Sequence, residues 1–432
     1  PAGESSPSLG KLTMDIDIRP AFAEEMGQLG LMASYSYGGA FGDAEDNIAV
    51  SGTRPEWTLC AFDRQAEDEK GHPLMATSYA AFPFTIRANG RAMSMAGISV
   101  VGTRPEYRRR GLLRQIMTWA FAEQRERGQS VAGLWASQAA IYQRYGFAPA
   151  GMNREYAIDT VDIALMSEPS QDTYSVSRHR PMAVLDDIRE VYKIFITKRT
   201  GYLHRGKSLW LNAVLSEEGG SAADGPVYVA LAGPKDSPQG YAVYTLRAGQ
   251  VRHASRPQEI KIRDFAWLNM GAARSLWQFF ARHDLVGRVS WANAPLDDPA
   301  QSLMMEPRML HSRDSEGTWW RIVDVAGALS QRGYDHENRL VLGIAGDDLA
   351  PWNNGTWRID TPGYPEEEAK VTATDDVPDI QLSIRALAGL YSGMYSARTL
   401  ANWGQLVGSE QGIAMADRLF STTFAPHCPD HY

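Results

Sequence analysis

The 432-residue chain has only two cysteines, Cys60 and Cys428, which lie far apart in the sequence. Two such thiols do not make a disulfide framework, so we expect both to be free and buried inside the fold. The small number of cysteines also predicts a reducing compartment. No apolar run approaches the roughly 20 residues that cross a bilayer. The start, Pro-Ala-Gly-Glu-Ser-Ser-Pro, lacks the charged and apolar regions of a signal peptide and predicts a mobile tail. These absences predict a cytoplasmic protein without a membrane segment.

The chain also has fewer basic than acidic residues. Lysine and arginine total 43 against 51 aspartates and glutamates, which gives a formal net charge of −8. This balance argues against nonspecific nucleic-acid binding and favours small cationic partners. The hydrophobic content of 44% supplies ample cores. At roughly 150 residues per domain, the length predicts about three domains.

Two familiar phosphate-binding patterns, G-x-x-x-x-G-K-[ST] and G-x-G-x-x-G, are missing. The chain instead has Arg108, Arg109, Arg110 and Gly111 between a Val-rich strand and an amphipathic helix. The first N–H groups of a helix have no intrahelical partner and favour anions. The arginines add forked, charged donors, and a glycine lets the backbone approach a pyrophosphate. We therefore predict a phosphate site here, with a solvated basic helix start as the simpler alternative.

The order of elements around this arginine loop, residues 108–111, is informative. Asn89-Gly90 closes a predicted hairpin, since both residues accept the positive φ of a type I′ turn. After the loop come the helix, a strand over Val131–Ala136, a short helix through Tyr142 and a further strand. The order and the arginine motif resemble the GCN5-related N-acetyltransferases (GNAT). Leu113 departs from the Gly or Ala that this family usually has there.

After residue 160 the chain repeats this order of strands and helices once, and its composition then changes. A Ser/Pro/Gln/Asp-rich linker is predicted over 167–177, followed by helices over 182–200 and 209–215 and by three strands. Asn269-Met270-Gly271-Ala272 stands where the arginine loop would be, so we interpret this segment as a degenerate copy without a cofactor site. After Asp297-Asp298-Pro299 the composition changes, and a helix over 323–332 and strands over 340–344, 356–360 and 380–384 are predicted.

Taken together, the whole chain resembles one GNAT family, the enhanced-intracellular-survival (Eis) acetyltransferases. The landmarks are the arginine loop, Ala136-Ser137, the run 141–147, the third-domain entry 319–323 and the helix at 389–391. The resemblance implies an α/β (α+β) protein with two tandem acetyltransferase domains and a sterol-carrier-protein-like domain. We place the catalytic domain at 14–160, the degenerate domain at 175–300 and the third domain at 305–432, with its C-terminal tail returning to the active site. The resemblance also implies a homohexamer.

The resemblance implies acetyl-CoA as the cosubstrate. In this fold the pantetheine arm pairs with a splayed strand, so backbone groups of Val101 and Thr103 are the expected contacts, and Ser137 approaches the same arm. The predicted cofactor residues are Val100, Val101, Thr103, Arg108, Arg109, Arg110, Gly111, Leu112 and Ser137.

Acetyl transfer to an amine needs an acid for the departing thiolate and a base for the amine. By resemblance, Tyr142 is the general acid, and Tyr145 is the tyrosine expected to serve only as a core aromatic. By resemblance the base is the C-terminal carboxylate of Tyr432, with a disordered tail as the alternative. The ending also suggests a metal cluster of His427, Cys428 and His431, but no second ligand pair accompanies it, and we predict no metal.

Two positions bear on the acceptor. Trp135 stands where some members have a histidine, and His431 where they have an acid, so the cleft is expected to be less negative and more aromatic. We predict an N-acetyltransferase acting on a polycationic small molecule, such as an aminoglycoside or polyamine, or on a lysine side chain. The alternative is a non-catalytic acyl-CoA sensor or a lipid or sterol carrier. Retention of Tyr142 and of the arginine loop favours the enzyme. Binding of nucleic acid or membrane is not expected.

Overall fold

The computed structural model describes residues 15–38, 52–167, 173–216, 225–364 and 367–432. The start of the chain and part of the linker predicted over 167–177 lie outside these residues. The chain divides into two compact units. The first comprises Pro1–Phe82 and Ile98–Glu123, and the second comprises Pro83–Gly97 and Gln124–Tyr432.

The first unit is built on antiparallel strands and two helices. Strand β1 (Ile16–Arg19) pairs with β2 (Cys60–Glu67), and β2 pairs with the start of β3 (Pro73–Ala88). The helices are α1 (Met26–Tyr37), which follows the short turn η1 (Ala23–Glu25), and α3 (Leu112–Glu126). The small core of this unit contains Leu29, Met32, Cys60, Phe62, Met75 and Val100.

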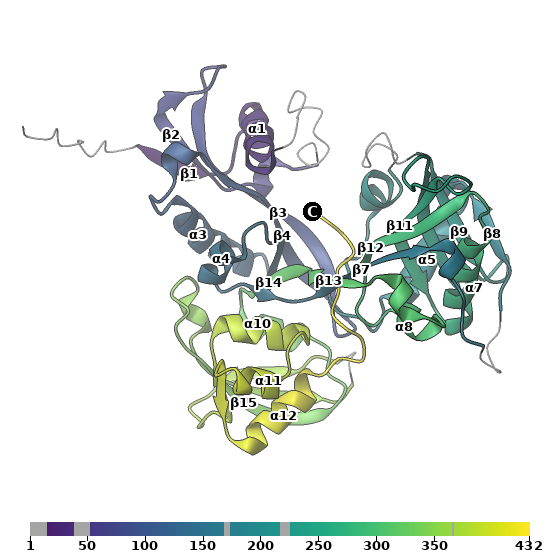
Figure 1. Cartoon of the computed structure of the whole chain (residues 1–432). Coiled ribbons are helices and arrows are strands. Elements are labelled where there is room, and N and C mark those ends of the chain that lie inside the picture. The colour runs from purple at the N-terminus through teal and green to yellow at the C-terminus, as the bar shows by residue number, and fades with distance from the viewer. Residues whose placement is uncertain (1–14, 39–51, 168–172, 217–224, 365–366) are drawn as a thin grey trace, which may run out of the picture. The chain divides into compact units, whose positions relative to one another are not determined.

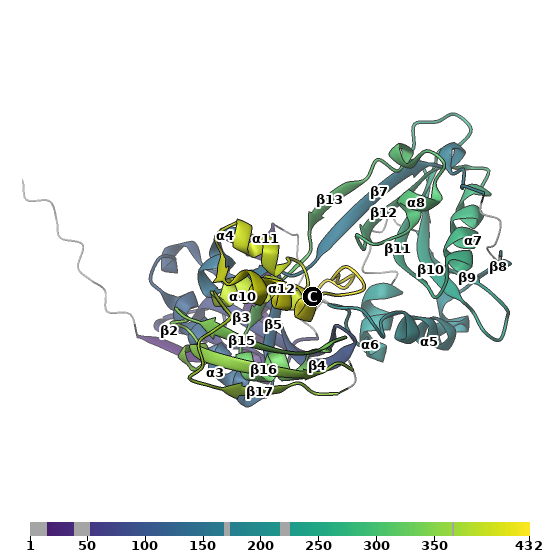
Figure 2. The same cartoon turned by 90° about the horizontal axis from the view of Figure 1, so that it is seen from below.

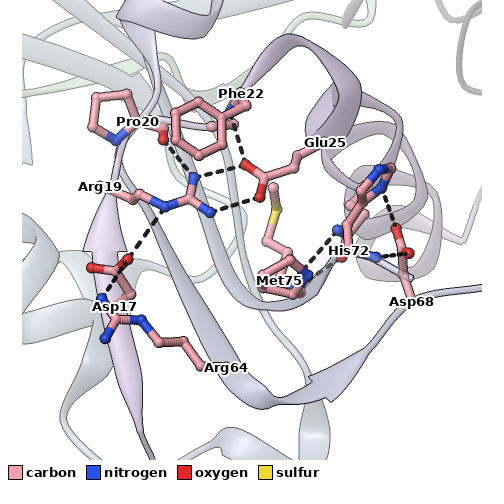
Figure 3. Close-up of polar contacts among 12 residues, drawn as sticks. Asp17, Arg19, Pro20, Phe22, Glu25, Arg64, Asp68, His72 and Met75 are labelled. Atoms are coloured by element: carbon pink, nitrogen blue, oxygen red, sulfur yellow. Dashed lines mark hydrogen bonds and ion pairs between the residues drawn. The ribbon is translucent and has the colours of Figure 1, made fainter. Parts of the chain in front are cut away.

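A buried carboxylate joins β1 to the start of α1 (Figure 3). Glu25 is only 2% exposed and accepts two hydrogen bonds from the guanidinium of Arg19, at 2.6 and 2.7 Å. It also accepts the backbone N–H of Phe22 at 2.8 Å. Burial alone would raise the pKa of Glu25, but the bonds from Arg19 and Phe22 hold that pKa below its usual value. This ion pair therefore fixes the angle at which the chain enters α1.

The second unit begins with the predicted hairpin. The end of β3 turns through Asn89 and Gly90 into β4 (Arg91–Thr103), with φ values of 45° and 90° at the two turn residues. Two successive positive φ values are what a type I′ turn requires, so the hairpin prediction is confirmed. The side-chain amide of Asn89 also donates to the carbonyl of Gly333 at 3.1 Å, which ties the turn to a distant segment.

Strand β5 (Val131–Trp135) lies next to β4 in this unit, and Met95–Gly97 pairs in parallel with Val131–Gly133. On its other side β5 pairs with β14 (Thr318–Ile322), which in turn pairs with β6 (Ala148–Pro149). The segment expected to open the third domain thus supplies a strand between β5 and β6. Helix α4 (Ala139–Tyr142) and the turn η5 (Gln143–Tyr145) connect β5 to β6.

A second sheet has the strand order β13-β7-β12-β11-β10-β9-β8. Its strands are β7 (Met152–Asp159), β8 (Val176–His179), β9 (Val227–Ala232), β10 (Gly240–Arg247), β11 (Gln258–Trp267), β12 (Val286–Ala294) and β13 (Arg313–Glu316). Figure 2 shows α5 (Leu185–Phe195) and α7 (Met270–Ala281) on opposite sides of this sheet. Burial of both faces explains the continuous apolar run of β10.

Two helices of this region differ from their predicted ranges. The helix predicted over 182–200 is shorter, because Pro181–Ala183 forms a separate turn before α5 and the chain leaves the helix at Ile196. The helix predicted over 209–215 consists of α6 (Lys207–Leu209) and a π-helical turn at Trp210–Val214. Short connecting helices follow at α8 (Ala300–Leu303) and Pro307–Leu310.

The third sheet has the order β17-β16-β15-β18-β19. Its elements are α9 (Val325–Gln331), β15 (Glu337–Ile344), β16 (Gly355–Pro362), β17 (Lys370–Ala373), β18 (Ile380–Leu382), α10 (Ile384–Ser392), α11 (Ala397–Asn402), β19 (Leu406–Gly408) and α12 (Glu410–Phe420). Figure 1 shows α10, α11 and α12 gathered beside β15. The strand predicted over 380–384 ends at Leu382, because Ser383 caps α10 by accepting the N–H of Ala386. In the described part of the chain, no helix has both the length and the apolar character needed to cross a membrane.

Candidate functional site

The end of β4, in the first unit, is held in an unusual backbone conformation. Val100 has a φ of 52°, which is rare for a β-branched residue and interrupts the regular extended path. The hydroxyl of Ser78 donates to the Val100 carbonyl at 2.7 Å and fixes this conformation. At Gly102 an added Cβ would lie 2.7 Å from the Ser36 hydroxyl, so the Ser36 side chain would have to move to admit one. The strained segment is the one whose backbone we predicted to contact a pantetheine arm.

The arginine loop follows in the same unit and leads into α3. Arg109 and Gly111 both have positive φ, 61° and 79°. No heavy atom lies within 4 Å of a Cβ placed on Gly111, so the glycine is needed for its conformation and open space lies beside it. The side chains of Arg108, Arg109 and Arg110 are exposed, whereas Leu112 is buried under the first turn of the helix.

Two contacts orient these arginines. Arg108 donates through Nε to the carbonyl of Thr103 at 3.1 Å, and the Arg110 guanidinium lies over the ring of Tyr107 at 5.5 Å. Tyr107 is itself fixed by a 2.7 Å hydrogen bond to Asp63. Exposed guanidinium groups beside the free N–H groups of a helix start fit a pyrophosphate. The residues present therefore fit the diphosphate end of a CoA thioester.

The matching junction of the second sheet lacks these features. There Asn269 caps α7, and its side-chain oxygen accepts the N–H of Ala272 at 3.0 Å. Its amide nitrogen contacts Tyr174 and Gln239 at 3.3 and 3.2 Å. Because a neutral side chain already occupies the first N–H groups of this helix, no anion is needed there. This geometry supports our interpretation of the segment as a copy without a cofactor site.

The second unit holds the predicted catalytic tyrosines and Ser137. Ser137 is exposed in the turn between β5 and α4. Tyr142 ends α4, is buried, and packs edge-on against Phe147 with ring centroids 5.9 Å apart. Tyr145, which we expected to be the core aromatic, is the less buried of the two tyrosines. The difference arises because α4 turns Tyr142 back toward the chain that enters β6.

The chain leaves α12 at Phe420, and its last residues, 426–432 (the C-terminal tail), form an extended segment (Figure 1). His427 is buried, its backbone N–H donates to the Thr200 carbonyl at 3.0 Å, and its Nδ1 donates to the Met152 carbonyl at 3.1 Å. Burial lowers the pKa of His427 to about 4, so the ring is neutral at pH 7. Cys428 is a buried free thiol, as is Cys60, so the prediction that both thiols are free and buried is confirmed. The described residues contain no group of three His, Cys, Asp or Glu side chains placed to hold a metal.

The last residues of the tail lie against β5. The indole Nε1 of Trp135 donates to the Asp430 carbonyl at 3.0 Å, and its ring stacks on His431. The Tyr432 ring packs edge-on against Phe84, at 5.0 Å between centroids. A Cβ on Gly133 would lie 3.0 Å from the Tyr432 hydroxyl oxygen, so this glycine leaves the space that the terminal ring occupies. The tail is thus ordered, and its end lies beside the strand that leads to Tyr142.

One part of this arrangement was missed from the sequence. Arg205 is buried and forms ion pairs with Asp264 on β11 and with Asp430 in the tail. The partners are separated from it by 59 and 225 positions, and nothing in the local pattern marks them.

Comparisons with known proteins agree with this architecture. An acetyltransferase (GNAT) domain family matches residues 17–150, and a second family of the same description matches residues 201–322. A sterol carrier protein domain family matches residues 325–429. GNAT domains use an acyl-CoA donor.

Similar proteins include an uncharacterized N-acetyltransferase of Streptomyces coelicolor, 28% identical, with 87% of this chain and 90% of that protein covered. N-acetyltransferase Eis of Mycobacterium tuberculosis is 27% identical, with 71% and 72% covered. Among solved structures, a GCN5-related N-acetyltransferase from Anabaena variabilis has a TM-score of 0.82 and 25% identity, covering 96% of this chain and 100% of that chain. Eis1 from Mycobacterium abscessus has a TM-score of 0.79 and 24% identity, with the same coverage. The chain is an Eis-like N-acetyltransferase of the GCN5-related family, with two GNAT domains followed by a sterol-carrier-protein-like domain.

Proposed function

We propose that the protein transfers an acetyl group from acetyl-CoA directly to a primary amine, with Tyr142 as general acid and the Tyr432 carboxylate as general base. The acceptor is a polycationic small molecule, such as an aminoglycoside or polyamine, or a lysine side chain. The observation that carries the proposal is the ordered tail, whose last residue packs beside Gly133 on β5, the strand that leads to Tyr142. The tail buries His427, Cys428 and Asp430, whereas most chain ends fray, and this order supports a role for the tail.

In the predicted donor site, different residues hold different parts of acetyl-CoA. The arginine loop and the first turn of α3 hold the diphosphate, and the backbone of Val101 and Thr103 holds the pantetheine arm, with Ser137 near it. When bound, acetyl-CoA supplies the thioester whose acyl carbon the amine attacks. The strain at Val100 and the positive φ at Gly111 support a loop shaped for this purpose.

Proton transfer completes the reaction. A new C–N bond forms as the C–S bond breaks, the thiolate that leaves takes the phenolic proton of Tyr142, and the Tyr432 carboxylate accepts a proton from the amine. Holding both reactants in line supplies much of the acceleration. A buried carboxylate next to a cationic amine is a suitable base, because desolvation raises the carboxylate pKa while the opposite charge limits that rise.

The acceptor is inferred from charge and ring chemistry. The net charge of −8 favours cations over anions, and Trp135 with His431 gives the tail an aromatic end instead of an acidic one. The family resemblance further implies a homohexamer, and the two free cysteines support a cytoplasmic location. Light scattering after size-exclusion chromatography tests the assembly.

The decisive experiment measures release of free CoA thiol from acetyl-CoA with aminoglycosides, polyamines and lysine peptides. Tyr142→Phe should abolish turnover with the accepted amine class while leaving acetyl-CoA binding intact. Tyr145→Phe is the matched control, because it removes a neighbouring phenol from η5, and it should keep most of the activity. Tight acetyl-CoA binding without turnover on any amine would contradict the enzyme and support the sensor or carrier alternative.

A further inference from the structure

Arg205 joins the C-terminal tail to the second GNAT domain. Its Nη1 and Nη2 donate to the two oxygens of Asp264 at 2.6 and 3.0 Å, and its Nε donates to Oδ1 of Asp430 at 2.8 Å. The side chains of Arg205, Asp264 and Asp430 are 1%, 5% and 3% exposed. A forked guanidinium that serves two buried carboxylates fixes the position of each relative to the other.

Burial of the Arg205, Asp264 and Asp430 charges costs free energy of desolvation. This cost argues that the cluster has a role other than stabilising the fold. Two carboxylates share one guanidinium, and Oδ2 of Asp430 is buried without a hydrogen-bond partner. Burial raises the pKa of Asp430 to about 6, with the charge of Arg205 opposing the rise and that of Asp264 adding to it. Buried ion pairs of this kind contribute little net stability compared with apolar packing, but they specify one arrangement.

Two further contacts from the second GNAT domain lie along the tail just before Asp430. Asn293 on β12 donates through Nδ2 to the Pro429 carbonyl at 2.7 Å. Gly201 has a φ of +93°, and a Cβ there would lie 2.5 Å from the His427 carbonyl oxygen. The close backbone approach at Gly201 is available only to glycine.

We propose that the second GNAT domain, which lacks a cofactor loop, serves as a clamp for the C-terminal tail, with Arg205 as the positioning residue that fixes Asp430 and thereby places Tyr432. The inference rests on the proposed role of Tyr432 in the reaction. Asp430 is separated from Tyr432 by one residue, so at about 3.5 Å per residue the anchor lies roughly 7 Å from the terminal residue. Because Asp430 is fixed so close to the end of the chain, Tyr432 has little freedom to move.

The test combines Asp430→Ala with deletion of Tyr432. The clamp predicts that Asp430→Ala lowers kcat roughly tenfold or more while KM for acetyl-CoA stays within about twofold, since the arginine loop is untouched. Asp430→Asn keeps the shape and one acceptor for Arg205, and it should fall between Asp430→Ala and the parent. The double variant should be no worse than the deletion alone, because both changes act through the same group.

Glu259→Gln is the matched control. Glu259 also lies on β11 and pairs with Arg247, away from the tail, so its loss should leave kcat unchanged. Hydrogen exchange of the peptide 421–432, followed by mass spectrometry, gives a readout independent of activity. Exchange in this peptide should rise strongly in Asp430→Ala and stay at the parent level in Glu259→Gln.

The outcomes separate the two proposals. If deletion of Tyr432 leaves turnover intact, the proposed base is wrong, and faster exchange in Asp430→Ala still establishes the anchor of the tail. If the deletion abolishes turnover while Asp430→Ala shows the parent kcat and parent exchange, the clamp is wrong and the base stands. Additive losses in the double variant would also overturn the clamp.

Discussion

The indole of Trp135 and the imidazole of His431 stack with ring centroids 3.8 Å apart and planes inclined by 20°. The same indole donates to the carbonyl of Asp430, so β5 holds the tail by one ring contact and one hydrogen bond. Both residues were singled out in the sequence as departures from the family pattern. The structure shows that the two departures contact each other, which means that a change at one position has consequences at the other.

Trp135→Phe should separate these two contacts. The phenyl ring retains an aromatic surface for His431 but removes the hydrogen bond to Asp430, worth about 1 kcal/mol. We expect a modest fall in kcat for Trp135→Phe and a larger fall for Trp135→Ala, with KM for acetyl-CoA unchanged in both. Steady-state kinetics with the accepted amine measure this. Trp403→Phe, at an exposed tryptophan, is the control, and equal effects at the two sites would refute a specific role for the stack.

Acid should weaken the docked tail through His427. Burial lowers the pKa of this histidine from 6.5 to about 4, so its contribution to stability is fully present above pH 6.5 and is lost as the pH falls from 6.5 to 4. At about 1.4 kcal/mol per pKa unit, the loss is on the order of 3 kcal/mol. Asp430, whose pKa is raised to about 6, changes stability in the opposite direction over part of this range.

The effect of His427 is isolated by comparing variants. Melting temperatures of the parent and of His427→Gln should converge as the pH is lowered from 7 to 5, since the variant has no ring to protonate. His311→Gln, at an exposed histidine, should follow the parent at every pH. Parallel curves for the parent and His427→Gln would show that the ring does not titrate in this way.

Gly133→Ala should displace the end of the tail. The added methyl group would lie 2.9 Å from the Met95 sulfur, closer than real Cβ contacts, and 3.0 Å from the Tyr432 hydroxyl, which is tighter than most such contacts. Because the Tyr432 ring is one of the side chains that must give way, we expect a several-fold fall in kcat and faster hydrogen exchange in the tail. Gly27→Ala is the counterpart in a helix with open space around it. It should raise stability by about 0.5–1 kcal/mol and leave kcat unchanged, as thermal unfolding and CoA-release assays will show.

The parts of the protein that the sequence predicted are those with local signals. The hairpin at Asn89-Gly90 and the arginine loop each depend on a few adjacent residues whose backbone preferences point to one structure. The placement of β14 between β5 and β6 depends on pairing between segments far apart in the chain. The Arg205 anchor is similar, because a buried arginine looks like any surface arginine until its carboxylate partners are known. Local patterns cannot supply such pairings.

Arg109→Gln should affect donor binding without affecting the chemistry. Arg109 is exposed beside the start of α3, and a charge-assisted hydrogen bond to a phosphate is worth about 1.5–3 kcal/mol. We therefore expect KM for acetyl-CoA to rise roughly tenfold with kcat unchanged, and the parent affinity to fall with added salt more steeply than that of the variant. Titration calorimetry at two salt concentrations measures both effects. Lys198→Gln removes an exposed cation from the second GNAT-like region and should change neither constant. A fall in kcat without a change in donor affinity would mean that the arginine loop acts in the reaction and not in holding the diphosphate.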